Sequence, residues 1–79
     1  MSIYRIERRE IYPDKIRSSI IGRNFTSLDE CDQKIKDYAE AWRKEAWLIH
    51  HHDGQSKVFF DGYYVEFTRL SSSQTILIT

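Results

Sequence analysis

The sequence predicts a single α+β domain over residues 1–79, in which one helix packs across an antiparallel sheet in the order ββαβββ. Three observations predict this two-layer fold. Two strand-prone segments flank a Pro-Asp turn, an amphipathic segment begins with a capping motif, and two Asp-Gly dipeptides divide the second half of the chain. A chain of 79 residues is long enough for one such domain and too short for a second.

The N-terminal part predicts a β-hairpin. Residues 3–12 and 16–25 are rich in isoleucine, tyrosine and arginine, and Pro13-Asp14 between them is a turn signal. The register of this hairpin stays open, because a loop of two residues and a longer loop both fit the sequence.

The next segment predicts a helix from about residue 27 to residue 45. Ser27 and Glu30 have the spacing of a capping box, in which each side chain satisfies a free backbone N–H of the other residue. Apolar side chains then follow at steps of three and four residues and form one stripe: Leu28, Cys31, Ile35, Tyr38 and Trp42.

The second half of the chain predicts a three-stranded meander. Asp53-Gly54 and Asp61-Gly62 are dipeptides that favour two-residue hairpin turns. The expected strands are 46–52, 55–60 and 63–70. The following Ser71-Ser72-Ser73 is expected to be flexible, and the strand-prone residues 75–79 are expected to add an edge strand or to dock on another chain.

Two-residue loops fix the pairing of this meander. The expected pairs are Phe60 with Tyr63, Val58 with Val65, Lys57 with Glu66, Ile49 with Val58, Trp47 with Phe60 and His50 with Lys57. One face of the sheet then holds Trp47, Ile49, Val58, Phe60, Tyr63, Val65 and Phe67, and the other holds Leu48, His50, Lys57, Phe59, Tyr64 and Glu66. The first face is apolar and should receive the helix.

Composition and charge exclude some classes of protein. Lys plus Arg and Asp plus Glu number 12 each, so no net charge favours nucleic acid or an anionic membrane. Residues 1–24 nevertheless carry six bases and three acids, so the rest of the chain carries an excess of three acids. Cys31 is the single cysteine, and no signal-peptide core or membrane-spanning run is found, so a cytoplasmic location is expected.

The second face of the meander predicts a protein-binding surface. Leu48, Phe59 and Tyr64 form an apolar cross-strand row where a half-exposed sheet normally has polar side chains. The polar rim of this surface would be His50, Lys57 and Glu66. The alternative is that the N-terminal hairpin or the C-terminal segment covers the row.

The basic N-terminal hairpin is the alternative binding surface, and its expected ligand is nucleic acid. Its basic side chains are Arg5, Arg8, Arg9, Arg17 and Arg23, with Tyr4 and Tyr12 between them. Glu7 and Glu10 interrupt this run, and strand alternation divides the arginines between two faces.

Metal and catalytic interpretations have weaker support. His50, His51 and His52 have no second cluster of ligand residues elsewhere in the sequence, so a metal site is weakly supported. Cys31 lies on the apolar stripe of the helix, which indicates a small buried side chain more simply than a nucleophile. No catalytic or phosphate-binding motif is found, so no enzyme activity, no metal and no cofactor are expected.

The sequence therefore predicts a protein-binding module that acts as an adaptor, a regulator or an inhibitor of a larger protein, or that associates with itself as a homodimer.

Overall fold

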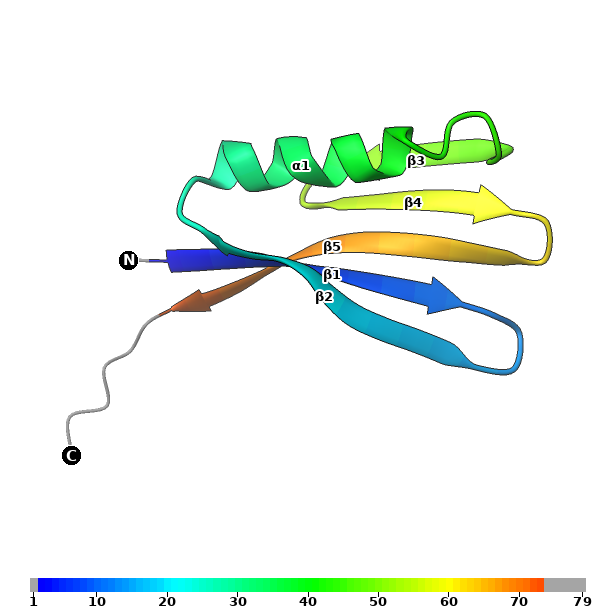
Figure 1. The fold of residues 1–79 in the computed structure, drawn as a ribbon, viewed down its shortest axis with the longest axis horizontal. Coiled ribbons are helices and arrows are strands. Elements are labelled where there is room, and N and C mark those ends of the chain that lie inside the picture. Colours follow the sequence, from blue (N-terminus) through cyan, green and yellow to red (C-terminus); the bar gives the residue numbers. More distant parts are fainter. Residues whose placement is uncertain (1, 74–79) are drawn as a thin grey trace.

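The computed structural model describes residues 2–73 and has the predicted α+β architecture (Figure 1). Its elements are β1 (Ser2–Ile11), β2 (Ile16–Phe25), α1 (Leu28–Glu40), β3 (Leu48–His52), β4 (Gln55–Phe60) and β5 (Tyr63–Ser73). This order confirms the prediction ββαβββ. In the described part of the chain, no helix has the length and apolar character needed to cross a membrane.

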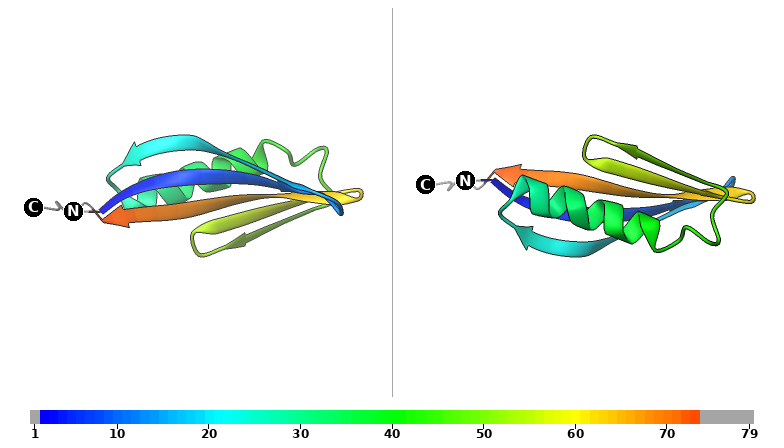
Figure 2. Two further views of the ribbon diagram at one scale, coloured as in Figure 1. Left: turned by 90° about the horizontal axis from the view of Figure 1, so that it is seen from below. Right: turned by 90° about the horizontal axis from the view of Figure 1, so that it is seen from above.

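The five strands form one antiparallel sheet in the order β2-β1-β5-β4-β3. The N-terminal hairpin and the three-stranded meander are joined at the centre of the sheet. There β1 pairs with β5 over ten residues, from Ser2↔Ser73 to Ile11↔Tyr64. The sheet is twisted, so the β3–β4 hairpin and β2 diverge on either side of the central strands (Figure 2). The helix α1 lies across one face, which gives the two layers.

The N-terminal hairpin has a four-residue loop. Ile11 pairs with Ile16, and the backbone N–H of Tyr12 donates to the carbonyl of Lys15 at 2.9 Å. Register shifts near Ile6 interrupt the other end of the hairpin, where Asn24 has a positive φ of 63°. An irregularity of this kind bends the strand toward the start of α1.

The helix begins as predicted and ends earlier than predicted. Ser27 is the N-cap, and its hydroxyl accepts a hydrogen bond from the backbone N–H of Glu30 at 3.3 Å. The expected end at residue 45 is wrong, because α1 ends at Glu40 and residues 41–45 form turns. A helix of 13 residues is about 20 Å long, after which the chain turns back to enter the sheet at β3.

The core lies between α1 and the sheet. The helix contributes Cys31, Ile35 and Ala39, and the sheet contributes Ile6, Val58, Val65 and Phe67. Leu28 and Trp42, the two ends of the predicted stripe, remain partly exposed.

The predicted meander register is confirmed. Val58 pairs with both Ile49 and Val65, and Lys57 pairs with both His50 and Glu66. The two turns are two residues long, and Gly54 and Gly62 have φ values of +68° and +86°. Only glycine adopts such values without strain, which explains why each turn ends in glycine.

Two predictions about the strand ends are wrong. Trp47 was expected on the helix side, but it precedes β3, is 69% exposed, and packs its ring at 5.6 Å from that of Phe59. Strand alternation does not reach this residue, because the chain is still leaving the turns after α1. Residues 71–73, expected to be flexible, form the end of β5, because the first residues of β1 pair with them. Residues 75–79, for which an edge strand was expected, lie outside the described residues.

Candidate functional site

The sheet face away from α1, here called the open face, carries an apolar row that crosses all five strands. Alternation places Leu48, Phe59 and Tyr64 on this face, and the register confirms them as direct neighbours. Tyr64 also pairs with Ile11, and Ile11 pairs with Ile16. The apolar row is therefore one residue per strand: Ile16, Ile11, Tyr64, Phe59 and Leu48.

The side chains of the apolar row are open to solvent to different degrees. Ile16 at one end is 56% exposed and Leu48 at the other is 45% exposed, while the three central members are half-buried. The rings of Phe59 and Tyr64 stack at 5.4 Å, and the ring of Trp47 adds a further aromatic side chain through its contact with Phe59. Neighbouring rings stabilise one another, so this surface is largely pre-formed.

The N-terminal hairpin does not cover the apolar row. β1 and β2 lie in the same sheet and extend the row by two residues. Among residues 2–73, no helix or strand packs over the open face; α1, the one helix, lies on the other side (Figures 1 and 2). The alternative that the hairpin buries Leu48, Phe59 and Tyr64 is therefore excluded. The alternative that the C-terminal segment covers them falls on residues 74–79, which lie outside the described residues.

A charged row runs beside the apolar row on the open face. It consists of Ser18, Arg9, Glu66, Lys57 and His50, which are neighbours in the register. Glu66 is buried between Arg9 and Lys57. The ammonium of Lys57 lies 5.9 Å from the centroid of the Tyr64 ring, so the two rows are in contact.

The other side of the apolar row is bordered by turns that carry acids. Asp14 lies in the β1–β2 loop and Asp61 in the β4–β5 turn, and both are exposed. Lys15 also lies in the first loop, with its ammonium 5.3 Å from the Tyr12 ring. One side of the apolar row therefore carries Arg9, Lys57 and Glu66, and the loops on the other side carry Asp14, Lys15 and Asp61, so each side holds charges of both signs.

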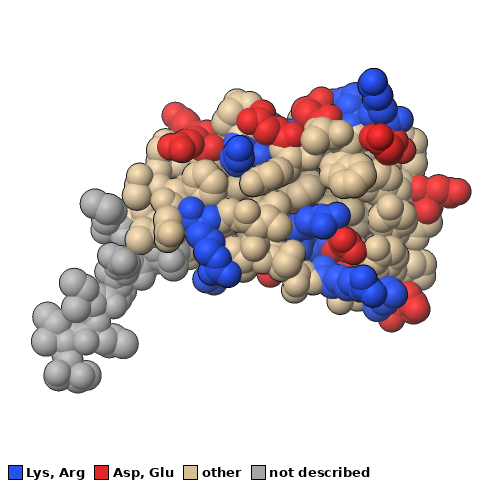
Figure 3. Space-filling model, in the orientation of Figure 1, with Lys and Arg blue, Asp and Glu red and all other residues tan. Residues whose placement is uncertain are grey.

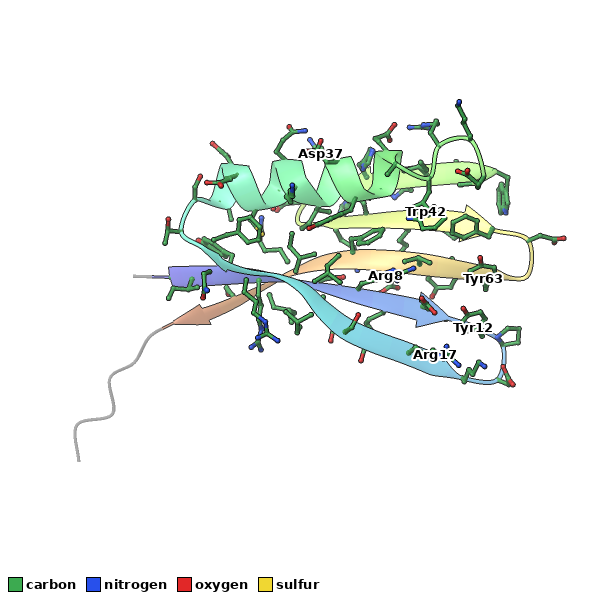
Figure 4. All side chains as sticks on the ribbon, viewed as in Figure 1. Arg8, Tyr12, Arg17, Asp37, Trp42 and Tyr63 are labelled. Atoms are coloured by element: carbon green, nitrogen blue, oxygen red, sulfur yellow. The ribbon has the colours of Figure 1, made fainter. Side chains whose placement is uncertain are left out.

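A second set of aromatic side chains lies at the same end of the sheet on the α1 side. Trp42 packs edge-on against Phe60 at 5.6 Å, Phe60 stacks on Tyr63 at 4.9 Å, and Tyr63 stacks on Tyr12 at 5.0 Å (Figure 4). The pairing of Phe60 with Tyr63 was predicted and is confirmed. The contacts of Tyr12 and Trp42 were not predicted, because both residues lie in connections whose conformation has no strand or helix period. This ladder packs the β1–β2 loop and the turns after α1 against the end of β4 and the start of β5.

The five arginines of the nucleic-acid alternative do not form one surface. Arg5 and Arg9 pair with Leu70 and Glu66, which places them on the open face. Arg8 and Arg17 lie on the α1 side around Glu10, and Arg8 forms an ion pair with that carboxylate at 3.1 Å. Arg23 is exposed and lies between Gly22 and Phe25, where the register shifts. The expected division of the other four arginines between two faces is confirmed.

The surface on the α1 side shows the charge asymmetry of the sequence. In Figure 3, acidic side chains gather along α1 and basic ones over the β1–β2 hairpin. A hollow of about 470 Å³ lies between them, and its apolar lining includes Tyr38, Trp42 and Phe67. Arg8 and Glu45 also line this hollow, which is separate from the open face.

Two polar contacts that join α1 to the sheet were also missed in the sequence. The guanidinium of Arg69 in β5 donates to both carboxylate oxygens of Asp32 at 2.8 and 2.7 Å. The ring of His51 lies 2.6 Å from the hydroxyl of Ser56 and 2.8 Å from the carboxylate of Glu40. Alternation of the three histidines would have placed His51 on the α1 side. No pattern in the neighbouring sequence predicts that Ser56 and Glu40 are its hydrogen-bond partners.

The surroundings of the histidines and of Cys31 bear on the metal and nucleophile interpretations. His50 and His52 share the open face with ring centroids 6.4 Å apart, and in the described residues no three His, Cys, Asp or Glu side chains converge on a metal position. Burial raises the pKa of the Cys31 thiol, which disfavours the reactive thiolate.

The chain was compared with protein-family models, with curated proteins and with solved structures, and no significant match was found in any of them.

Proposed function

We propose that this protein is a binding module without enzymatic activity that attaches to another protein surface through its open face. The observation that carries the proposal is the apolar row, which crosses five strands with both ends about half exposed. An antiparallel sheet that faces water on one side normally alternates to polar residues there. A continuous apolar strip on such a face is typical of an interaction site.

The composition of the strip supports a protein as the partner. Trp47, Phe59 and Tyr64 supply large, rigid contact area, and tryptophan and tyrosine dominate binding energy at protein interfaces. Polar side chains border the strip on both sides, as in the rim of a protein interface. Binding of this kind would suit an adaptor, a regulator or an inhibitor of a larger protein, or a chain that binds its own copy.

A matched pair of leucines tests the proposal. Leu48 on the open face is 45% exposed and Leu28 on the α1 side is 43% exposed. Truncation to alanine removes the same atoms at the same exposure from opposite faces. In affinity capture from cells that encode the protein, Leu48→Ala should reduce the amount of retained partner, and Leu28→Ala should leave it at the wild-type level. Leu48→Ala combined with Phe59→Ala should abolish capture.

Retention of the partner by the folded open-face double variant would contradict the proposal. If the open-face double variant folds, as shown by far-UV circular dichroism, and retains every partner at the wild-type level, the apolar row is not the binding surface. Loss of binding in Leu28→Ala alone would move the surface to the α1 side.

Salt dependence separates this function from nucleic-acid binding by the arginines. Association through an apolar strip should change little between about 50 and 200 mM salt, whereas phosphate-driven binding weakens steeply and linearly on a double-logarithmic plot.

We also propose a cytoplasmic location, which the single unpaired Cys31 thiol supports.

A further inference from the structure

We infer that the outer edge of β2 binds an extended acidic segment of another protein, which adds to the sheet as a sixth strand. The inference goes beyond the proposed function, because it concerns an edge of the sheet and not its open face. Two observations carry it. One side of the β2 backbone has no neighbouring strand among the described residues, and the basic side chains of β2 have no acidic partner there.

β2 is the longer of the two edge strands. It stands at one end of the order β2-β1-β5-β4-β3 and has ten residues, whereas β3 at the other end has five. In Figure 1 it forms the lower border of the sheet, and residues 15–19 along this border are exposed. Proteins usually shorten or cover such an edge, because its free backbone groups pair with other strands.

The hydrogen-bond pattern identifies which backbone groups of β2 point outward. The N–H of Tyr12 donates to the carbonyl of Lys15, so these two residues form a hydrogen-bonded pair. Hydrogen-bonded and non-hydrogen-bonded pairs alternate along an antiparallel ladder, so the backbone groups of Ile16, Ser18 and Ile20 point away from β1. These alternating donors and acceptors are what a further strand binds when it adds to a sheet.

The charged side chains of this edge determine the sign of its ligand. Residues 15–25 include the bases Lys15, Arg17 and Arg23 and no acid. Arg17 and Arg23 are exposed, and neither forms an ion pair with any residue in the described part of the chain. Opposite charges on neighbouring strands attract and like charges repel, so an acidic strand fits this edge.

A hollow beside Arg17 offers a place for an acidic side chain. Its volume is about 250 Å³, and its lining residues are Arg8, Glu10, Arg17, Ser18 and Ser19. Glu10 is already engaged, because its carboxylate pairs with Arg8 at 3.1 Å and accepts a hydrogen bond from the Tyr12 hydroxyl at 2.9 Å. Arg17 therefore remains available to a carboxylate on the added strand (Figure 4).

Strand alternation predicts the pattern of the added segment. Its residues opposite Ile16 and Ile20 hydrogen-bond to β2 and direct their side chains to the open face, where apolar side chains continue the apolar row. Its residue opposite Arg17 directs an acidic side chain to the other face. A second copy of β2 does not fit, because residues 15–25 of two copies would bring together three bases from each copy and no acid.

Peptide titration tests the edge. The probe is a short peptide with blocked ends in which valine alternates with glutamate, and the control peptide has lysine in place of each glutamate. In ¹H–¹⁵N NMR spectra, the glutamate peptide should shift the backbone amide signals of Ile16, Ser18 and Ile20, and the lysine peptide should not. The signals of Ile49 and His51, at the edge strand β3, should stay in place. No shift with the glutamate peptide at about 2 mM, or equal shifts with both peptides, overturns the inference.

Methylation of the peptide backbone tests the hydrogen bonds separately from the charges. The valines of the bound peptide direct their N–H groups toward β2, and the glutamates direct theirs away. N-methylation of two valines should therefore weaken binding about tenfold or more, whereas N-methylation of two glutamates should change it by less than about twofold. Equal effects of the two modifications would show that no strand is added.

Charge reversal on the protein tests the role of Arg17. Arg17→Glu should weaken binding of the glutamate peptide about fivefold and should allow the lysine peptide to bind. Lys44→Glu makes the same change of charge in the exposed turns after α1 and should leave both affinities unchanged. Wild-type affinities in folded Arg17→Glu would overturn the selection of an acidic ligand.

Failure of the edge site is distinguishable from failure of the proposed function. Leu48→Ala combined with Phe59→Ala should leave peptide binding unchanged, because both residues lie away from β2. If the amide signals of Ser18 and Ile20 shift with protein concentration alone, the occupant is a second copy. If a ten-nucleotide single-stranded DNA shifts them and the glutamate peptide does not, the ligand is nucleic acid. Either result overturns the inference and leaves the open face untouched.

Discussion

Gly54→Ala should destabilise the protein more than Gly62→Ala, although both residues end a two-residue Asp-Gly turn. Both glycines have φ in the left-handed region, at +68° and +86°, where an L-residue is disfavoured by about 1–2 kcal/mol. A methyl group at Gly62 meets no atom within 4 Å. A methyl group at Gly54 would lie 2.9 Å from the guanidinium carbon of Arg69, so that side chain must move.

The movement of Arg69 has a definite consequence. Its guanidinium holds the carboxylate of Asp32 at 2.7 and 2.8 Å, and the pair joins β5 to α1. A partly exposed contact in which one guanidinium nitrogen donates to both carboxylate oxygens contributes about 1 kcal/mol. Gly54→Ala should therefore lower the free energy of unfolding by about 2–3 kcal/mol and Gly62→Ala by about 1–2 kcal/mol.

Urea unfolding of a double-mutant cycle separates the two effects. In an Asp32→Ala background the ion pair is absent, so the additional loss in Gly54→Ala should shrink by about 1 kcal/mol, while the effect of Gly62→Ala should not change. Equal losses for the two glycines in both backgrounds would refute the packing of Arg69 against Gly54.

Three further predictions concern the helix and its contacts. Ser27→Ala removes the N-cap acceptor and should reduce the free energy of unfolding by about 1 kcal/mol in urea melts; no change would contradict the cap. Cys31 should resist iodoacetamide in the folded protein and react on unfolding, because burial raises its thiol pKa; fast alkylation of folded protein would contradict this. The pKa of Glu40 is lowered by hydrogen bonds from Arg43 first and His51 second, so its stabilising contribution is present above the unfolded carboxyl pKa of about 4.3. That contribution is lost as the pH falls through the folded pKa, and Arg43→Gln should raise the NMR titration midpoint of Glu40.

The meander was predictable because its two-residue turns fix how the strands pair. A two-residue loop permits one register, and alternation then sorts the side chains, so the contacts of Val58 and Lys57 followed from Asp-Gly positions alone. The prediction failed at Trp47, where alternation was extended past the residue at which the strand begins.

The pairing of β1 with β5 was not predictable from local signals. Ile11 and Tyr64 are neighbours in the sheet, but no turn between them fixes their register. This long-range pairing adds Ile11 and Ile16 to the three residues recognised in the sequence. It also orders residues 71–73, whose composition alone suggested flexibility.

The polar contacts of α1 were missed for the same reason. Asp32 and Arg69 are 37 positions apart, and Glu40 and His51 are joined only because the chain turns back after the helix. Spacing within one element predicts which side chains share a face, but it does not predict which side chain of another element meets them.

Methyl NMR tests directly whether the open face makes the contact. As protein concentration rises from about 20 μM to 1 mM, or as the captured partner is added, the signals of Leu48 and Ile16 should shift, because both lie in the apolar row. The signals of Leu28 and Ile35, on the side of α1, should stay in place. Shifts at Leu28 with none at Leu48 would contradict the account.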